Sequence, residues 1–211
     1  AISSALENNL LSLYGAADPL GADGALAVMR VLSAVGMFTI MPSMGIAMGA
    51  QPIIGYNHGA MKPERVLLTL KYGVITGTAF TTAGFLACMF FSHGIAALFT
   101  DDAQLISLAA GGLKIVILAF PLIGSQIVIG NFFQAIGKAR LAIFLSLTRQ
   151  LLFLLPFLLI LPEFWGQTGV WASMPLADVL SSIVTLWFIR RFLKYYCGKN
   201  REYLAQPAGQ V

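Results

Sequence analysis

Ionisable side chains interrupt several apolar segments of the sequence that are long enough to cross a membrane. They are Glu7, Arg30, Lys114, Arg149 and Asp178. A charge within such a segment is costly unless it finds a partner or water, so it marks a functional site by default. Two interpretations stay open: structural ion pairs that lock helices together, and cavity charges that bind a substrate or relay protons. For Arg30, snorkelling toward the membrane surface is a third.

Arg149 and Asp178 lie at matching depths on consecutive segments. Each is about ten residues from its segment end, which at about 1.5 Å per helical residue places both roughly 15 Å into the membrane. Because consecutive membrane helices run antiparallel, we expect the two side chains to face each other or to share a polar cavity. Asp178, Ser181, Ser182 and Thr185 are spaced as one helix face, so this polar stripe is expected to face protein or water.

Glu7 has two candidate partners in the sequence. Glu7 and Arg30 flank the same loop at similar depths, so the sequence predicts a pair across that hairpin. Lys114 is also near the middle of its segment and is the alternative partner of Glu7.

Amide side chains form a second polar pattern near the end of the segment 104–133. Gln126, Gly130 and Gln134 recur every four residues, with Asn131 beside them. At this spacing they share a helix face. Amides hydrogen-bond a neighbouring helix as readily as a ligand, so packing and cavity lining both stay open.

The stretch GAQPIIGYNHGA ends the first complete apolar segment. Asn57 and Gly59 fit a helix end, so the sequence predicts a turn over 56–60. Gln51 lies within the helix beside Pro52, whose missing N–H frees a backbone carbonyl about one turn earlier. We therefore expect Gln51 to line a cavity.

Prolines and glycine pairs indicate where the helices bend and where they meet. The candidate hinges are Pro42, Pro52, Pro121, Pro156 and Pro175. Each proline removes a backbone hydrogen bond and is able to kink its helix. Gly45 with Gly49, and Gly73 with Gly77, are spaced for close helix packing in lipid.

The composition shows which elements carry these residues. Of the 211 residues 58% are hydrophobic and only 10% are charged, whereas a soluble domain has about a quarter charged residues. The sequence therefore predicts an all-α, polytopic membrane protein whose solvent is the lipid bilayer. The expected spans are 1–15 (the second part of a helix, as in a fragment), 25–54, 66–92, 104–133, 139–161 and 169–190, followed by a basic tail over 193–211.

Charge separates the loops into two kinds that alternate along the chain. Lys and Arg occur in the loops 57–71 and 134–140 and in the tail, whereas the alternate loops carry acidic residues without Lys or Arg. By the positive-inside rule, the basic loops and the C-terminus are cytoplasmic. The net charge of +4 is explained in the same way, and no basic-aromatic patch indicates nucleic-acid binding.

Cysteine and histidine are too few and too dispersed for a metal centre or a nucleophilic enzyme. Cys88 and Cys197 are far apart, and His58 and His93 lie at span ends that are expected on opposite sides of the membrane. No metal-ligand spacing or catalytic constellation is present, so we expect neither a cofactor nor an enzyme activity.

Three segments together resemble one family of transporters. MPSMGIAMGAQPIIGYNHGAMKPERV, FPLIGSQIVIGNFFQAIGKAR and LSLTRQLLFLLPFLLILP, in this order and spacing, resemble the bacterial branch of the multidrug and toxic compound extrusion (MATE) family over about residues 5–192. The resemblance implies the C-terminal six-helix lobe of a two-lobe transporter, with an N-terminal lobe of the same polypeptide as its partner. It places the chain in the bacterial cytoplasmic (inner) membrane.

The resemblance also implies a function. The family exports organic cations and other amphipathic compounds in exchange for H⁺ or Na⁺, by alternating access between its lobes. Methionines suit such mixed ligands, and the spans supply Met29, Met37, Met41, Met44 and Met48. Gly124 stands where the sodium-coupled branch has an acid, so the resemblance assigns no ion site here. A lipid-linked oligosaccharide flippase of the same superfamily is the alternative.

Overall fold

A computed structural model describes residues 2–15 and 21–205 of the chain. Every regular element within these residues is a helix. Asp18, which belongs to one predicted acidic loop, and residues 206–211 of the predicted tail lie outside the described residues. The elements are α1 (Ile2–Gly15), α2 (Gly21–Gly59), α3 (Pro63–Ala97), α4 (Ala103–Val116), the 3₁₀ turn η1 (Ile117–Ala119), α5 (Phe120–Ala135), α6 (Ala139–Leu147), the π-helical segment η2 (Thr148–Leu154) and α7 (Leu155–Ala205).

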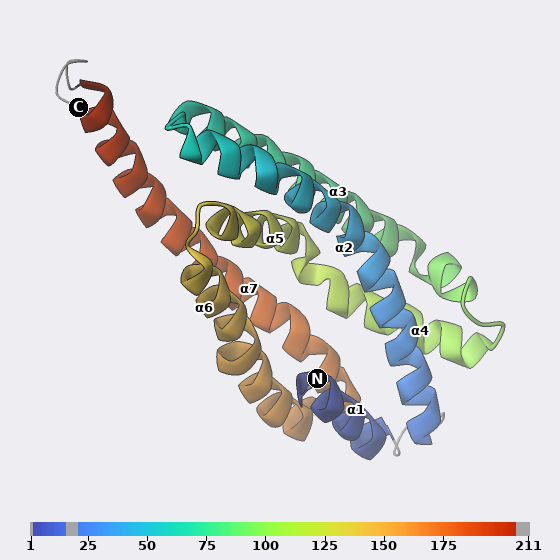
Figure 1. Cartoon of the computed structure of the whole chain (residues 1–211). Coiled ribbons are helices and arrows are strands. Elements are labelled where there is room, and N and C mark those ends of the chain that lie inside the picture. The colour runs from blue at the N-terminus through green and yellow to red at the C-terminus, as the bar shows by residue number, and fades with distance from the viewer. Residues whose placement is uncertain (1, 16–20, 206–211) are drawn as a thin grey trace.

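Four helical stretches of the described chain are long and apolar enough to cross a membrane, which confirms the predicted all-helical membrane protein. They are Gly21–Gly59, Pro63–Ala97, Ala103–Ala135 and Ala139–Tyr196. In Figure 1, α2 and α3 form a long hairpin, α4 and α5 pass beside it, and α6 and α7 flank α1 at the other side of the bundle. The C-terminal part of α7 extends beyond its neighbours.

The fourth stretch turns back on itself at Gly166. This residue has φ 54° and ψ −134°, a conformation that suits glycine alone. The two arms then pack closely, because a Cβ on Gly169 would lie 2.5 Å from the carbonyl oxygen of Leu161. The segments expected as the spans 139–161 and 169–190 are these two arms, and α6 and α7 run side by side in Figure 1.

The candidate hinge prolines differ in what the backbone does around them. Pro121 lies in the first turn of α5, directly after η1 interrupts the segment expected as one span over 104–133. Pro156 follows the π-helical segment η2. At Pro42, Pro52 and Pro175 the helix continues without a break.

The two predicted glycine pairs have different surroundings. Cβ atoms on Gly73 and Gly77 would lie 3.1 Å from Val128 of α5, so this pair does bring two helices together. The same two helices also approach closely at Gly124 of α5, where a Cβ would lie 2.5 Å from the Thr81 hydroxyl of α3. The close packing expected at Gly45 and Gly49 does not occur between the described helices, because no described residue lies within 4 Å of a Cβ at either position.

The turn after α2 falls later than the sequence predicts. Helix α2 continues to Gly59, and the chain turns at Met61, whose φ is 55°. Asn57 is buried within the last helical turn. Its side-chain Nδ2 donates to the backbone carbonyl of Ile53 at 2.8 Å, and its backbone carbonyl accepts from the Lys62 N–H at 2.9 Å. The expected turn over 56–60 is therefore wrong by about one helical turn, because these side-chain and backbone bonds prolong the helix.

Two apolar clusters make up the core, one toward each end of the bundle. The first includes Leu11, Val28, Leu32, Leu113, Phe120, Leu158 and Trp171. The second includes Ile54, Val66, Leu70, Val128, Phe132, Phe133 and Ile189. Helix α7 contributes to both clusters, and its polar side chains Asp178, Ser181, Ser182 and Thr185 are buried, so the polar site of this chain lies within the packed bundle.

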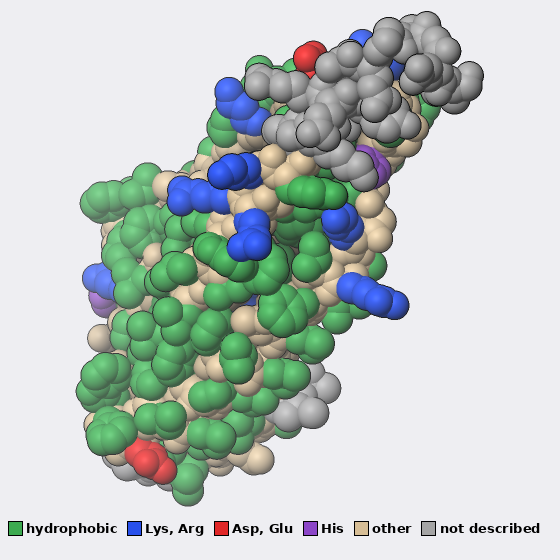
Figure 2. Space-filling view, turned by 90° about the vertical axis from the view of Figure 1, so that its left-hand side faces the viewer, with side chains coloured by type: hydrophobic (Ala, Val, Ile, Leu, Met, Phe, Trp, Pro, Cys, Tyr) green, Lys and Arg blue, Asp and Glu red, His purple; other side chains and the backbone are tan. Residues whose placement is uncertain are grey.

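Charge is distributed unevenly along the molecule. On the face seen in Figure 2, Lys and Arg side chains gather toward one end, while much of the rest is hydrophobic. Exposed basic residues in the C-terminal part of α7 include Arg190, Arg191 and Lys194. A wide apolar surface beside a basic end is what a lipid-embedded helical bundle requires.

Candidate functional site

An ion pair joins the two arms of the α6–α7 hairpin. The Nε of Arg149, in η2, donates to Oδ1 of Asp178, in α7. The side chain of Asp178 is only 4% exposed, whereas that of Arg149 is 47% exposed. The contact expected from their matching depths is therefore present, with the carboxylate buried and the guanidinium at the edge of open space.

A polar network holds the backbone of Asp178 from the opposite side. The Nε2 of Gln126, in α5, donates to the carbonyl of Asp178 at 2.9 Å and also to the Ser182 hydroxyl. The same hydroxyl donates to that carbonyl at 2.7 Å. Ser181 and Thr185 are also buried, so the predicted stripe faces protein rather than lipid.

The backbone around Arg149 is irregular. Residues Thr148–Leu154 form a π-helical segment, in which the N–H of Leu155 donates to the carbonyl of Gln150, five residues earlier. Pro156 has no N–H to give, so the regular α pattern is not available here. π-helical turns are rare and are frequently found at functional sites. Arg149 is the second residue of this π-helical turn.

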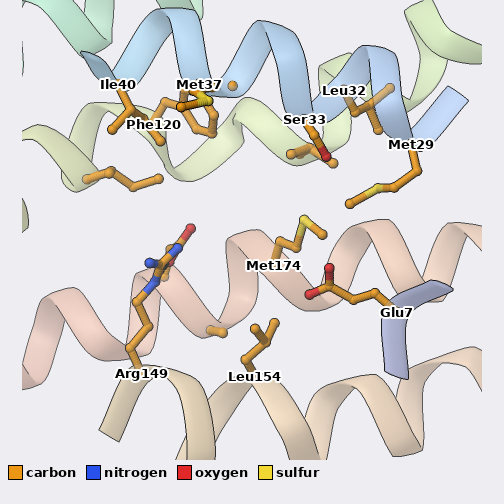
Figure 3. A pocket seen from close by; sticks show the side chains of 15 residues that line it. Glu7, Met29, Leu32, Ser33, Met37, Ile40, Phe120, Arg149, Leu154 and Met174 are labelled. Carbon is orange, nitrogen blue, oxygen red and sulfur yellow. Dashed lines mark hydrogen bonds and ion pairs between the residues drawn. The ribbon is translucent and has the colours of Figure 1, made fainter. Parts of the chain in front are cut away.

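A cavity of about 250 Å³ lies beside the ion pair; we call it the Glu7 cavity. Figure 3 shows Glu7 and Arg149 projecting into it from opposite ends, with Met174 between them. Helix α2 supplies one wall, which includes Met29, Ser33 and Met37. The cavity thus combines a carboxylate, an ion pair and several flexible thioethers, a lining that suits an amphipathic cation.

A second cavity, of about 360 Å³, lies on the other side of Arg149; we call it the amide cavity. Its polar lining is Gln126, Asn131, Gln134, Ser146, Arg149, Ser181 and Thr185. The amide pattern of the sequence is therefore gathered at one hollow, where Asn131 Nδ2 also donates to the carbonyl of Ile127 at 3.0 Å. Ile40, Ile123 and Arg149 line both cavities and form the boundary between them.

Three of the predicted site residues lie away from these cavities. Arg30 and Lys114 are exposed, and neither forms an ion pair with Glu7 in the described structure. The predicted pairing of Glu7 is therefore wrong, because depth alone does not fix the side of a helix from which a side chain leaves. Gln51 is half-buried but is absent from the lining of both cavities.

Several residues that line the Glu7 cavity were not predicted from the sequence. Met174 lies four residues before Asp178 and hence on the same helix face. Its place beside Asp178 could therefore have been predicted from helical spacing. Ser33 and Leu154 carry no such signal. Among the described residues, no group of three or more His, Cys, Asp or Glu side chains is placed to hold a metal ion.

Long apolar helices that enclose charged and amide-lined hollows partway along their length define a lobe of a membrane transporter. The sequence model of the family described as MatE matches residues 4–160. The chain belongs to the MatE family, and the MATE resemblance of the sequence is confirmed.

Relatives with curated functions agree with this assignment. The "Multidrug export protein MepA" of Staphylococcus haemolyticus (strain JCSC1435) is 23% identical over 188 residues, which cover 89% of this chain and 40% of that protein. The chain thus spans less than half the length of this relative. This relative is a multidrug transporter, so the flippase alternative is not favoured.

Solved structures show the same fold. A structure of the MATE multidrug transporter DinF-BH, solved as a complex, is 40% identical, with a TM-score of 0.72 over 78% of this chain and 37% of that one. The Vibrio cholerae MATE transporter VcmN, solved as a mutant, is 20% identical, with a TM-score of 0.82 over 92% of this chain and 43% of that one. Both likenesses involve less than half of the solved chains.

Proposed function

We propose that this chain is the C-terminal lobe of an exporter that moves amphipathic or cationic small molecules by alternating access, coupled to H⁺ or Na⁺. The observation that carries the proposal is the Glu7 cavity, where the carboxylate of Glu7, the Arg149–Asp178 pair and three methionines share one hollow in a member of the MatE family. A carboxylate among adaptable apolar groups recognises charge without demanding one shape.

The surface of α2 supports a role for a second lobe. Met37, Met41, Met44 and Met48 are all exposed, and their spacing places them along one side of the helix. Gly45 and Gly49 have open space beside them on the same helix. A methionine-rich face with small residues suits the wall of a cleft between this lobe and an N-terminal lobe of the same polypeptide.

The charge pattern supports an orientation. We infer that the basic end of the bundle and the C-terminus lie on the cytoplasmic side of a bacterial inner membrane. The amide cavity, which includes Gln134 near the end of α5, then lies nearer the cytoplasm, and the Glu7 cavity lies nearer the outside.

Efflux measurements on the full-length gene product test the proposal. Cells that express it are loaded with ethidium, and efflux is followed with an intact proton or sodium gradient and again after each gradient is collapsed. We expect efflux that stops with one of the gradients. Efflux that ignores both gradients contradicts the coupling, and the absence of ethidium efflux from expressing cells contradicts export of this class of compound.

A further inference from the structure

We propose that Arg149 is an internal cation that occupies the binding site of the transported cation at Asp178, and that the substrate displaces it. The inference rests on the proposed export function and names the device by which the site recognises its substrate. The starting observation is the asymmetry of the pair: the Asp178 side chain is 4% exposed and that of Arg149 is 47% exposed.

The carboxylate is the fixed member of the pair. The carbonyl of Asp178 accepts from both Gln126 and Ser182, and the residue is buried on a continuous stretch of α7. The guanidinium, in contrast, is attached through a long side chain to a π-helical turn. Movement within the pair is therefore expected of Arg149 rather than of Asp178.

The amide cavity offers a second position for the guanidinium of Arg149. Arg149 lines both cavities, so a change in its side-chain conformation moves its charge from the boundary into the amide cavity. There Gln126, Asn131 and Gln134 bring amide oxygens that accept hydrogen bonds from a guanidinium. Asp178, by contrast, is left without a counter-ion, and a buried unpaired carboxylate is strongly unfavourable.

This requirement defines the ligand. Arg149 leaves Asp178 only when another cation takes its place, so a neutral molecule does not open the boundary. Opening also adds space: the Glu7 cavity is about 250 Å³ and the amide cavity about 360 Å³, whereas sites for drug-sized ligands measure roughly 300–1,000 Å³. A monovalent organic cation that displaces Arg149 gains a site formed from both hollows.

Binding to the purified full-length protein in detergent tests the displacement. Ethidium is the cationic probe, and the uncharged dye N-phenyl-1-naphthylamine is the neutral one. Arg149→Gln removes the competitor, and if the paired state holds about 90% of the molecules, ethidium affinity should increase about tenfold. Arg149→Lys restores a competing cation and should return the affinity toward that of the unmodified protein. The neutral dye should gain clearly less affinity than ethidium from Arg149→Gln, because it makes no ion pair with Asp178.

Two further variants complete the experiment. Asp178→Asn should weaken ethidium binding, and in the Asp178→Asn background Arg149→Gln should no longer strengthen it. Arg140→Gln removes one exposed positive charge from the start of α6, outside the lining of both cavities, and should leave the affinity unchanged. Thermal unfolding identifies any variant that fails to fold.

The outcomes separate this inference from the proposed function. Ethidium affinity that is unchanged or weaker in folded Arg149→Gln overturns the displacement, even if the unmodified protein binds and exports ethidium. An unmodified protein that neither binds nor exports amphipathic cations overturns the proposed function instead. An equal gain for the neutral dye also contradicts the inference, because it shows that space alone limits binding.

Discussion

Arg149 and Asp178 meet across the α6–α7 hairpin, and they do so from unlike backbones: Arg149 leaves a π-helical turn, whereas Asp178 lies on a continuous α-helical stretch. Theirs is the one ion pair among the residues that the structure describes. It also forms part of the boundary between two cavities. The same contact therefore bears on stability and on binding, and the two effects are separable by measurement.

Removing either member of the pair should lower stability. We expect Asp178→Ala to reduce the free energy of unfolding by about 2 kcal/mol, the scale of a charge-assisted hydrogen bond. Arg149→Ala should cost more, because it leaves the buried carboxylate of Asp178 without a counter-ion, whereas water hydrates the half-exposed guanidinium that Asp178→Ala leaves unpaired. The measurement is thermal unfolding of each variant and of the double variant in detergent.

The double variant provides the internal control for the pair. If the contact contributes to stability, the loss in the double variant is smaller than the sum of the two single losses. Strictly additive losses would show that the side chains do not interact in solution.

Gly124 should tolerate no side chain. A Cβ there would lie 2.5 Å from the Thr81 hydroxyl of α3, so Gly124→Ala is expected to destabilise the fold by about 1–3 kcal/mol through overpacking. Gly130→Ala, on the same helix, is the matched control, since nothing lies within 4 Å of its Cβ. Comparison of the two melting temperatures checks the prediction, and equal melting temperatures would contradict the close α3–α5 contact.

Gln126 should matter more than the other glutamine of the amide pattern. Gln126→Leu removes the donor to the Asp178 carbonyl and the Ser182 hydroxyl, which should cost about 1 kcal/mol of stability. Gln134→Leu is the matched change at an exposed position with no such bonds. If both variants unfold at the same temperature, the network around Asp178 does not stabilise the bundle.

The orientation of the bundle is open to chemical labelling. In a background with Cys88 and Cys197 replaced by Ser, Met61→Cys and Glu163→Cys each introduce one thiol at an exposed position. A membrane-impermeant maleimide added to intact cells should label Glu163→Cys and spare Met61→Cys, which should react only after lysis. The reverse pattern would invert the topology that the basic loops predict.

Much of this architecture is contained in the sequence, because lipid imposes strong rules on helices. The apolar segments and the alternating basic loops follow directly from the cost of burying polar groups in lipid. The pair of Arg149 and Asp178 could be predicted for the same reason, since two charges at equal depth on adjacent helices have few other partners.

The sequence did not predict the direction in which the side chains point around the helices. Glu7 and Arg30 are also at similar depths, yet Arg30 is exposed and Glu7 enters a cavity. Gly45 and Gly49 fit a packing motif, but no described residue lies within 4 Å of a Cβ at either position. The π-helical segment was equally hidden, because its five-residue hydrogen bond depends on tertiary packing as well as on the following Pro156.

The reversal at Gly166 has a consequence for how the charges enter the membrane. Arg149 and Asp178 are only 29 residues apart, and the two arms come together at Gly169 and Leu161. A lone Arg or Asp at the centre of a helix costs about 2.5–3.5 kcal/mol to insert. If the arms enter the membrane as one closed hairpin, Arg149 and Asp178 already neutralise each other. This part of the chain then needs no other segment to pair its charges during insertion.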